Sequence, residues 1–281
     1  MKLRKKVNFD VCTFCNHKCS FCSNSDERTI KYQTSLEEFQ KVMQNVSKYV
    51  ETEELGLSAK GEVLVNNDFT KIVRSCKEDF AIPYIYISSN GALMDEKRAV
   101  EVIEAGLDSI KFSINALSRE AYKDVHKVDD FDKVVENFKT LLRLKKERYP
   151  KLKLFLSSVI DKTKEELESD FKELFTENFA LIDGISLYKL TYTPKFEVTQ
   201  NTKVTKKCAI PFKELYINSD GTLGLCCKDY FDEINFGSLL ENDFMDVYNS
   251  DSFKNVRKMH KTSEFPDDHL CKKCLLFEGG M

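Results

Sequence analysis

Cys12-Thr-Phe-Cys15-Asn-His-Lys-Cys19-Ser-Phe-Cys22 places four cysteines within eleven residues, directly after an alternating apolar segment at 7–11. Cys15, Cys19 and Cys22 have the spacing C-x3-C-x2-C. Three closely spaced thiolates on one loop can hold three irons of a cubane cluster, which leaves the fourth iron open to a cofactor or substrate. The same loop, read as C-x2-C-x3-C-x2-C, would also suit a tetrahedral zinc ion. The remainder of the chain favours the iron cluster.

Length and composition indicate a globular protein with a large core. The chain has 281 residues, 42% of them hydrophobic and 32% charged, which suits one large or two small domains. The net charge of −3 gives no basic field, so we expect no nucleic-acid partner. No apolar run approaches the roughly 18 residues that span a bilayer, and the N-terminus lacks the apolar core of a signal peptide. Ten cysteines without such a signal suggest metal ligands rather than disulfides, so we expect a cytoplasmic protein without a membrane partner.

Apolar runs alternate with amphipathic segments over the first two thirds of the chain. The predicted strands are 6–11, 54–58, 84–88, 109–114, 153–159 and 184–190. The predicted helices are 35–49, 68–78, 95–105, 131–147 and 164–177, and the first begins with a capping box formed by Ser35 and Glu38. About six strands alternating with helices predict an α/β fold with a parallel sheet, a partial (β/α)6 TIM-like barrel. Active sites of such sheets lie at the carboxyl ends of the strands, where the cysteine loop also falls.

The pattern changes after about residue 195, where segments shorten and five cysteines return. We therefore predict a barrel domain at 1–195 and a small cysteine-rich domain at 196–281. The C-terminal cysteines are arranged as Cys208-x12-Gly-x4-Cys226-Cys227, followed after a gap by Cys271-x2-Cys274. A four-cysteine zinc knuckle is one interpretation of this set.

At this point the chain resembles the radical S-adenosylmethionine (SAM) enzymes, in the branch with a SPASM or twitch domain at the C-terminus. Four stretches carry the resemblance: the C-x3-C-x-aromatic-C loop at 15–22, Ser-Ala-Lys-Gly-Glu-Val-Leu at 58–64, Ile-Ser-Ser-Asn-Gly at 87–91, and Ala-Gly-Leu-Asp-Ser-Ile-Lys-Phe-Ser-Ile-Asn at 105–115. The second resembles the family's Gly-Gly-Glu-Pro motif, but Lys60 replaces its first glycine and Val63 its proline.

The resemblance assigns roles to particular residues. Cys15, Cys19 and Cys22 would hold the SAM-binding [4Fe–4S] cluster. The SAM-binding residues that it implies are Phe21 beside the adenine, Gly61 and Glu62 at the methionyl amino group, and Ser89, Asn90, Ser113 and Asn115 at the ribose and carboxylate. A single auxiliary [4Fe–4S] cluster, as in the short twitch form, would be held by Cys208, Cys226, Cys271 and Cys274.

Several other residues keep two interpretations. Cys227 is left over from the auxiliary set, although an exchange with Cys226 stays open. It would either donate a hydrogen atom to a substrate radical or pack as a small buried hydrophobe. His126 falls in a helical pattern and is interpreted as a surface residue rather than a proton acceptor. Cys76 is interpreted as a core residue.

The resemblance implies reductive cleavage of SAM to a 5′-deoxyadenosyl radical, which takes a hydrogen atom from an unactivated substrate carbon. We expect a small polyhydroxylated substrate, sugar- or cyclitol-like, that is oxidised with the auxiliary cluster as electron acceptor, and a flavodoxin or ferredoxin as reductant. An epimerase with a cysteine hydrogen-atom donor and a ribosomal-peptide maturase are the alternatives. Fourteen residues precede Cys15, so we expect no leader-peptide-binding domain there. A zinc-stabilised binding module without catalysis is the remaining alternative.

Overall fold

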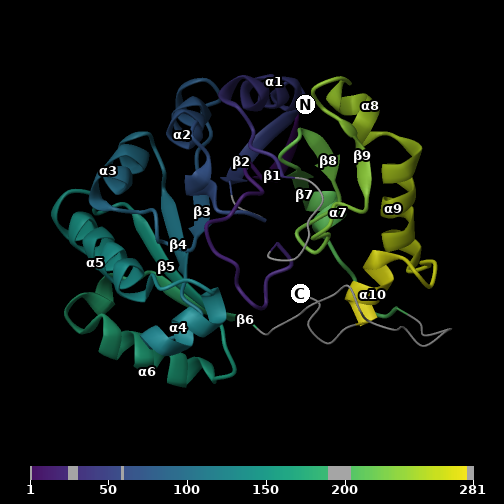
Figure 1. The fold of residues 1–281 in the computed structure, drawn as a ribbon. Coiled ribbons are helices and arrows are strands. Elements are labelled where there is room, and N and C mark those ends of the chain that lie inside the picture. Colours follow the sequence, from purple (N-terminus) through teal and green to yellow (C-terminus); the bar gives the residue numbers. More distant parts are fainter. Residues whose placement is uncertain (1, 25–30, 58–59, 189–203, 277–281) are drawn as a thin grey trace.

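The computed structural model describes residues 2–24, 31–57, 60–188 and 204–276, and these form one curved sheet flanked by helices (Figure 1). The strand order is β6-β5-β4-β3-β2-β1-β7-β8-β9. The strands are β1 (Leu3–Phe9), β2 (Val50–Gly56), β3 (Ile85–Ser89), β4 (Ser109–Ser113), β5 (Lys153–Val159), β6 (Gly184–Tyr188), β7 (Glu214–Ile217), β8 (Thr222–Gly224) and β9 (Asn235–Ser238). All neighbours from β6 to β7 pair in parallel, and β7, β8 and β9 pair antiparallel. The predicted α/β fold with a parallel sheet is confirmed.

Helices cover the outer side of the curved sheet (Figure 1). They are α1 (Leu36–Ser47), α2 (Phe69–Glu78), α3 (Glu96–Glu104), α4 (Arg119–His126), α5 (Phe131–Glu147), α6 (Lys164–Leu174), α7 (Ile210–Lys213), α8 (Phe244–Tyr248), α9 (Asp251–Thr262) and α10 (Leu270–Leu276), with 3-10 turns at Val63–Val65 and Thr176–Leu181. The five predicted helices are all present. The last predicted helix was too long, because α6 ends at Leu174 and a 3-10 turn follows. None of the described helices is both long and apolar enough to cross a bilayer.

The first helix shows how local sequence starts an element. The Ser35 side chain accepts a hydrogen bond from the Glu38 N–H, and the Glu38 carboxylate accepts one from the Ser35 N–H, so the predicted capping box is confirmed. The buried residues of α1 include Phe39, which packs on Phe9 of β1 with ring centroids 5.2 Å apart. Aromatic contacts of this kind fix α1 against the outer face of the sheet.

Side chains of the inner strands alternate between two faces, as in any pleated strand. On β1, Val7 and Phe9 are fully buried on the helix-covered face, so Asn8 between them points to the concave face. On β4, Ile110 and Phe112 are buried in the same way, and Lys111 between them is partly exposed. The concave face is consequently polar, and the main hydrophobic core lies between the sheet and its helices.

The C-terminal cysteine-rich segment extends the same sheet. β7 pairs in parallel with β1, with Asn8 opposite Tyr216. The Asn45 side chain of α1 donates to the carbonyl of Leu239, and the Tyr49 hydroxyl donates to Asp243. The predicted boundary between the two domains, at 195 and 196, and the end of the strand predicted at 184–190 both lie outside the described residues.

Candidate active site

The three cysteines of the C-x3-C-x2-C loop lie just beyond the carboxyl end of β1. The N–H groups of Lys18 and Ser20 donate to the carbonyls of His126 and Val125, at 3.3 and 2.8 Å. Carbonyls in the last turn of a helix have no partner within the helix, and here they bind the loop instead. The end of α4 therefore holds the loop in place. Cys15 is exposed, and Cys19 and Cys22 are partly exposed.

The protonation of these thiols shows that they lie close to one another. Burial is the main cause that raises the pKa of Cys15 to about 11 and that of Cys19 to about 12. Glu62 and Cys22 contribute to the pKa value of Cys15, and Cys22 and Cys15 contribute to that of Cys19. Mutual repulsion of this kind requires sulfur atoms that lie close together. Three soft thiolates gathered on one loop suit an iron–sulfur cluster, and metal binding would displace the thiol protons. The residues present therefore fit the predicted cluster.

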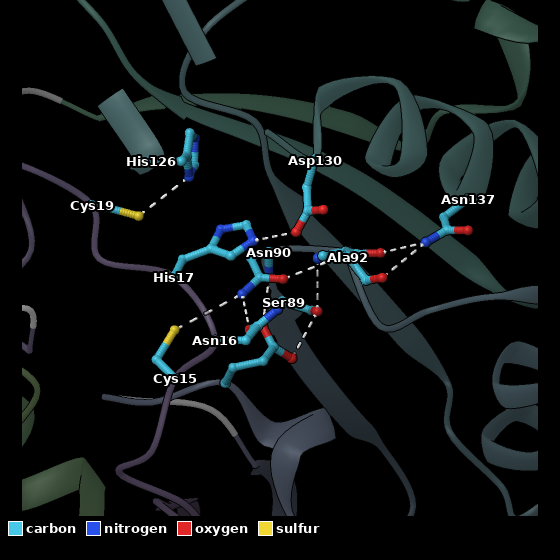
Figure 2. Close-up of polar contacts among 12 residues, drawn as sticks. Cys15, Asn16, His17, Cys19, Ser89, Asn90, Ala92, His126, Asp130 and Asn137 are labelled. Carbon is cyan, nitrogen blue, oxygen red and sulfur yellow. Dashed lines mark hydrogen bonds and ion pairs between the residues drawn. The ribbon is translucent and has the colours of Figure 1, made fainter. Parts of the chain in front are cut away.

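Two histidines accompany the loop (Figure 2). The side-chain atoms of His17, Cys19 and His126 that can coordinate a metal lie within 4.8 Å of one another. This set could also bind a single metal ion. A mononuclear site of this kind would leave Cys15 and Cys22 unused. The His126 side chain is buried, with only 1% exposed, so its interpretation as a surface residue is wrong. The sequence missed it because the last turn of α4 packs against a loop that begins more than a hundred residues earlier.

Position 61 must be glycine because it lies in close contact with the backbone of the cysteine loop. A Cβ atom at this position would lie 2.1 Å from the Cys12 carbonyl oxygen and 2.6 Å from that of Phe14. The next N–H, of Glu62, donates to the Phe14 carbonyl at 2.9 Å. The glycine therefore lets the segment after β2 lie directly on the backbone of the cysteine loop. Residues 58 and 59 of the same motif lie outside the described residues.

The Glu62 carboxylate joins this segment to the end of β3. Its Oε1 accepts from the Ser89 hydroxyl at 2.9 Å and from the Leu64 N–H at 3.2 Å, and its Oε2 accepts from the Asn90 N–H at 2.8 Å. Burial raises the pKa of Glu62, although these three donors work against the rise. Both oxygens thus already have partners in the protein, and a contact with the SAM amino group stays a prediction.

Asn90 extends the contact to the cysteine loop (Figure 2). Its Nδ2 donates to Asn16 Oδ1 at 2.8 Å and lies 3.9 Å from Cys15 Sγ. The Asn137 side chain of α5 fixes the following turn by donating to the Gly91 carbonyl at 2.8 Å. Glu62, Ser89, Asn90 and Cys15 are therefore brought together as the resemblance implies.

The other predicted SAM-binding residues lie further round the same edge. Ser113 Oγ lies 3.4 Å from Ser157 Oγ on the neighbouring strand. Asn115 is buried and turns toward His126, with its Nδ2 3.5 Å from His126 Nε2. The Phe21 ring meets the His126 ring edge-on at 6.3 Å. Asn115 and Phe21 thus both contact a histidine that the sequence analysis placed on the surface.

Lys60, which departs from the family motif, bridges to the C-terminal segment. Its ammonium group forms an ion pair with Asp232 and donates to Asn218 Oδ1 at 3.1 Å. The Lys60 side chain is only 5% exposed. The substitution of glycine by lysine therefore gives this chain a buried polar link between the segment after β2 and the C-terminal strands.

The C-terminal cysteines gather round one pocket. Its lining residues are Cys208, Ile210, Pro211, Leu225, Cys226, Lys228, His260, Leu270, Cys271, Cys274 and Leu275. Burial raises the pKa of Cys271 to about 12, and the neighbouring Cys274 and Cys208 contribute to that rise. Four thiols round an apolar pocket fit a fully ligated cluster. The four are the predicted auxiliary ligands, and Cys227 is not among the lining residues.

Cys227 lies close to Cys208 and Cys274 without lining the pocket, and it also adjoins Tyr216 of the concave face. The Tyr216 hydroxyl donates to Glu214 Oε2 at 3.1 Å, and Cys227 lies close enough to Tyr216 to affect its protonation. Burial raises the pKa of Tyr216, and the neighbouring Cys227 and Glu214 add to the effect. Cys227 lies in the turn that follows β8, which the Asp229 N–H closes by donating to the Cys226 carbonyl at 3.1 Å, so the two adjacent cysteines have different surroundings.

Comparisons with known proteins agree with this architecture. Residues 10–175 match the family described as the radical SAM superfamily, and residues 208–275 match SPASM, described as an iron-sulfur cluster-binding domain. A probable GTP 3′,8-cyclase of Saccharolobus islandicus is 33% identical over 128 residues, which are 46% of this chain and 40% of the relative. The matched region thus spans well under half the length of this curated relative.

Solved structures resemble the chain over most of its length. The crystal structure of BtrN in complex with AdoMet and 2-DOIA has a TM-score of 0.59 at 17% identity, covering 93% of this chain and 89% of BtrN. Streptococcus suis SuiB bound to S-adenosylmethionine has a TM-score of 0.71 at 14% identity, covering 92% of this chain and 68% of SuiB. At such low identity these likenesses establish the fold alone.

Proposed function

Since the chain belongs to the radical SAM superfamily and carries an iron–sulfur cluster-binding domain, we propose that it oxidises a small polyhydroxylated substrate, sugar- or cyclitol-like. The two domains imply SAM and two [4Fe–4S] clusters as cofactors. When bound, these groups supply a 5′-deoxyadenosyl radical that removes a hydrogen atom from carbon and an auxiliary acceptor for the remaining electron. The protein's own part is to bind the substrate, orient it and exclude water.

The observation that carries the proposal is the polar character of the concave face. Asn8 of β1 donates to Glu214 Oε2 of β7 at 3.0 Å, and the Tyr86 hydroxyl of β3 donates to Asn8 Oδ1 at 2.8 Å. Further along the sheet, the Lys111 ammonium donates to the Tyr188 hydroxyl at 3.0 Å. These groups pair with one another and keep further capacity for hydrogen bonds, which an apolar substrate would desolvate and hydroxyl groups can use by donating and accepting.

The concave face also holds one carboxylate in a defined orientation. Glu214 Oε2 accepts hydrogen bonds from both Asn8 and Tyr216, which hold the carboxylate in one orientation. Loss of two hydrogens from an alcohol carbon and its oxygen requires that a base accept the hydroxyl proton. We therefore assign that role to Glu214 within the proposal. A flavodoxin or ferredoxin would supply the reducing electron.

One specific observation favours an epimerase as the second candidate. Cys227 lies beside Tyr216, whose side chain shares a face of β7 with Glu214. A thiol in this place could donate a hydrogen atom to the opposite face of a substrate radical, which inverts that carbon, and the thiyl radical left behind would take an electron from the reductant and a proton from solvent. The two candidates share binding residues and differ in whether Cys227 is needed.

The experiment that separates the candidates uses a panel of sugars and cyclitols in D2O, with SAM, a reductant and the holoenzyme. Oxidation predicts 5′-deoxyadenosine together with a product two mass units lighter than the substrate. Cys227→Ala should still form this product, and Glu214→Gln should not. Epimerisation predicts deuterium in the product, lost in Cys227→Ala and retained in the buried control Cys76→Ala. If 5′-deoxyadenosine forms without either product, the proposal fails, and stimulation by peptides alone would favour a maturase.

A further inference from the structure

A chain of hydrogen bonds runs from the end of β5 to the cysteine loop. The Val159 N–H donates to Asn115 Oδ1 at 2.8 Å, Asn115 Nδ2 lies 3.5 Å from His126 Nε2, and His126 Nδ1 lies 3.2 Å from Cys19 Sγ. Figure 2 shows the last contact, with the His126 ring pointing at the sulfur. The three residues that meet here come from the end of β4, the end of α4 and the loop after β1.

The direction of each bond in this chain follows from its fixed end. The Val159 N–H can only donate, so the Asn115 atom that faces it is the amide oxygen. The Asn115 amide nitrogen must then face His126 Nε2, and because that nitrogen donates, Nε2 has to accept. The proton of the neutral ring consequently sits on Nδ1 and points at Cys19 Sγ.

Packing holds the ring in this position. The His126 ring stacks on Tyr122 with centroids 4.0 Å apart and planes at 15°, and His17 packs edge-on at 5.4 Å. Only 1% of His126 is exposed, so water does not compete for its nitrogens. The carbonyl of His126 also accepts from the Lys18 N–H, which ties the same residue to the loop by its backbone.

We propose that His126 is a positioning residue of the SAM-binding cluster, where its Nδ1–H donates a hydrogen bond to the Cys19 sulfur and raises the reduction potential of that cluster. Hydrogen bonds to ligand sulfurs are among the features that set the potentials of iron–sulfur clusters. The bond is stronger when the cluster carries an extra negative charge, so it stabilises the reduced form. The inference rests on the assignment of Cys19 as a ligand within the proposed function, and not on the substrate.

The test compares His126→Phe with the unmodified holoenzyme in a redox titration followed by electron paramagnetic resonance (EPR). Phenylalanine keeps a flat ring on Tyr122 and removes the donor. The EPR component that changes when SAM is added reports the SAM-binding cluster. We expect the equilibrium constant for reduction of this cluster to fall about tenfold in His126→Phe. For a one-electron couple this lowers the reduction potential by about 59 mV. In His126→Asn the side-chain nitrogen can take the place of Nδ1. We therefore expect this variant to recover most of the reduction potential that His126→Phe loses.

His260 offers a matched control. Its Nε2 lies 3.3 Å from Cys271 Sγ at the auxiliary site. His260→Phe should therefore leave the potential of the SAM-sensitive component unchanged. An unchanged potential in His126→Phe, or an equal fall in His126→Phe and His260→Phe, would overturn the inference.

A measurement on the unmodified protein covers the case in which His126→Phe does not fold. Holoenzyme labelled with 15N-histidine should show coupling of a histidine nitrogen to the reduced, SAM-sensitive EPR signal, and absence of that coupling would overturn the inference. If no signal responds to SAM at all, the ligand assignment of Cys19 fails, and the proposed function fails with it. That outcome differs from a SAM-sensitive signal whose potential does not depend on His126.

Discussion

The four histidines of the chain all lie beside cysteine ligands that we propose. His126 approaches Cys19, and His17 lies against His126. At the auxiliary site His260 approaches Cys271, and His269 Nδ1 accepts from the Cys271 N–H at 3.1 Å. Burial lowers the pKa of all four histidines, so the rings carry few positive charges near the thiols at neutral pH. His126 and His260, whose ring nitrogens face a cysteine sulfur, therefore offer a cluster hydrogen bonding rather than charge.

Cys12, the cysteine of the first loop that we do not assign as a ligand, should react very slowly with alkylating agents at neutral pH. Burial raises the pKa of Cys12 to about 11 from 9.0, which leaves about a hundredfold less thiolate at any pH well below 9. In the anaerobic holoenzyme at pH 8, we expect iodoacetamide to leave Cys12 unmodified and the rate of its modification to rise only as the pH approaches 11. Mass spectrometry of peptides after timed alkylation measures this.

The buried Cys76 of α2 serves as the control for this experiment, because burial raises its pKa still further. It should stay unmodified over the same range. Rapid alkylation of Cys12 at pH 8, with Cys76 protected, would contradict the burial of Cys12 described above.

At the scale of elements, the ends of strands and helices converge on the cysteine loop. The end of α4 holds it through two carbonyls, and the segment after β2 lies on it because Gly61 has no side chain. The end of β3 reaches the same loop through Asn90. Each contact is made by the terminus of an element, where backbone groups lack partners within the element. The site is thus an assembly of termini that the sheet brings to one edge.

The link between Lys60 and Asp232 should stabilise the protein measurably. Removing one partner of a buried ion pair leaves an uncompensated charge, and the Asp232 side chain is only 20% exposed. We expect Lys60→Met to lower the free energy of unfolding by about 3 kcal/mol. Asp232→Asn in the Lys60→Met background should restore part of the loss. Anaerobic denaturation of the holoprotein, followed by circular dichroism, measures both changes.

Lys71 and Asp68 provide the matched exposed pair. Their ion pair spans 2.8 Å, but the Lys71 side chain is 67% exposed. Solvent screens such pairs, so Lys71→Met should have little effect on stability. Equal effects of Lys60→Met and Lys71→Met would show that the link to Asp232 contributes nothing beyond a surface pair.

For the whole molecule, the sheet itself joins the two cysteine sites. β1 leads into the first cysteine loop and also pairs with β7, which lies between Cys208 and Cys226 in the sequence. Asn8 on β1 and Glu214 on β7 meet on the concave face of this sheet. Electron exchange with a substrate on this face would therefore involve residues of both halves of the chain.

Iron content should distinguish the two adjacent cysteines. We expect about eight irons per chain in the reconstituted protein, which corresponds to two cubane clusters. Cys226→Ser should reduce this to about four, because the Cys226 side chain lines the pocket with Cys208, Cys271 and Cys274. Cys227→Ser should keep about eight. Iron and acid-labile sulfide assays on matched preparations measure the difference, and the reverse pattern would show that Cys227 is the ligand.

The sequence by itself determined the features that depend on neighbouring residues. The spacing of Cys15, Cys19 and Cys22 within one loop, the alternation of strands with helices and the capping box at Ser35 and Glu38 are all local, because each depends on residues within one or two turns of chain. From them follow the parallel sheet and the edge at which the site lies.

Tertiary structure alone decided the features that join distant segments. His126 and Cys19 are 107 positions apart, and Lys60 and Asn218 are 158 apart. Likewise, the spacing C-x12-G-x4-C-C could not tell whether Cys226 or Cys227 is the ligand. That choice depends on which side chain points toward the distant helix that carries Cys271 and Cys274. Contacts of this length arise from the packing of complete elements, and no local pattern in the sequence records which termini will meet.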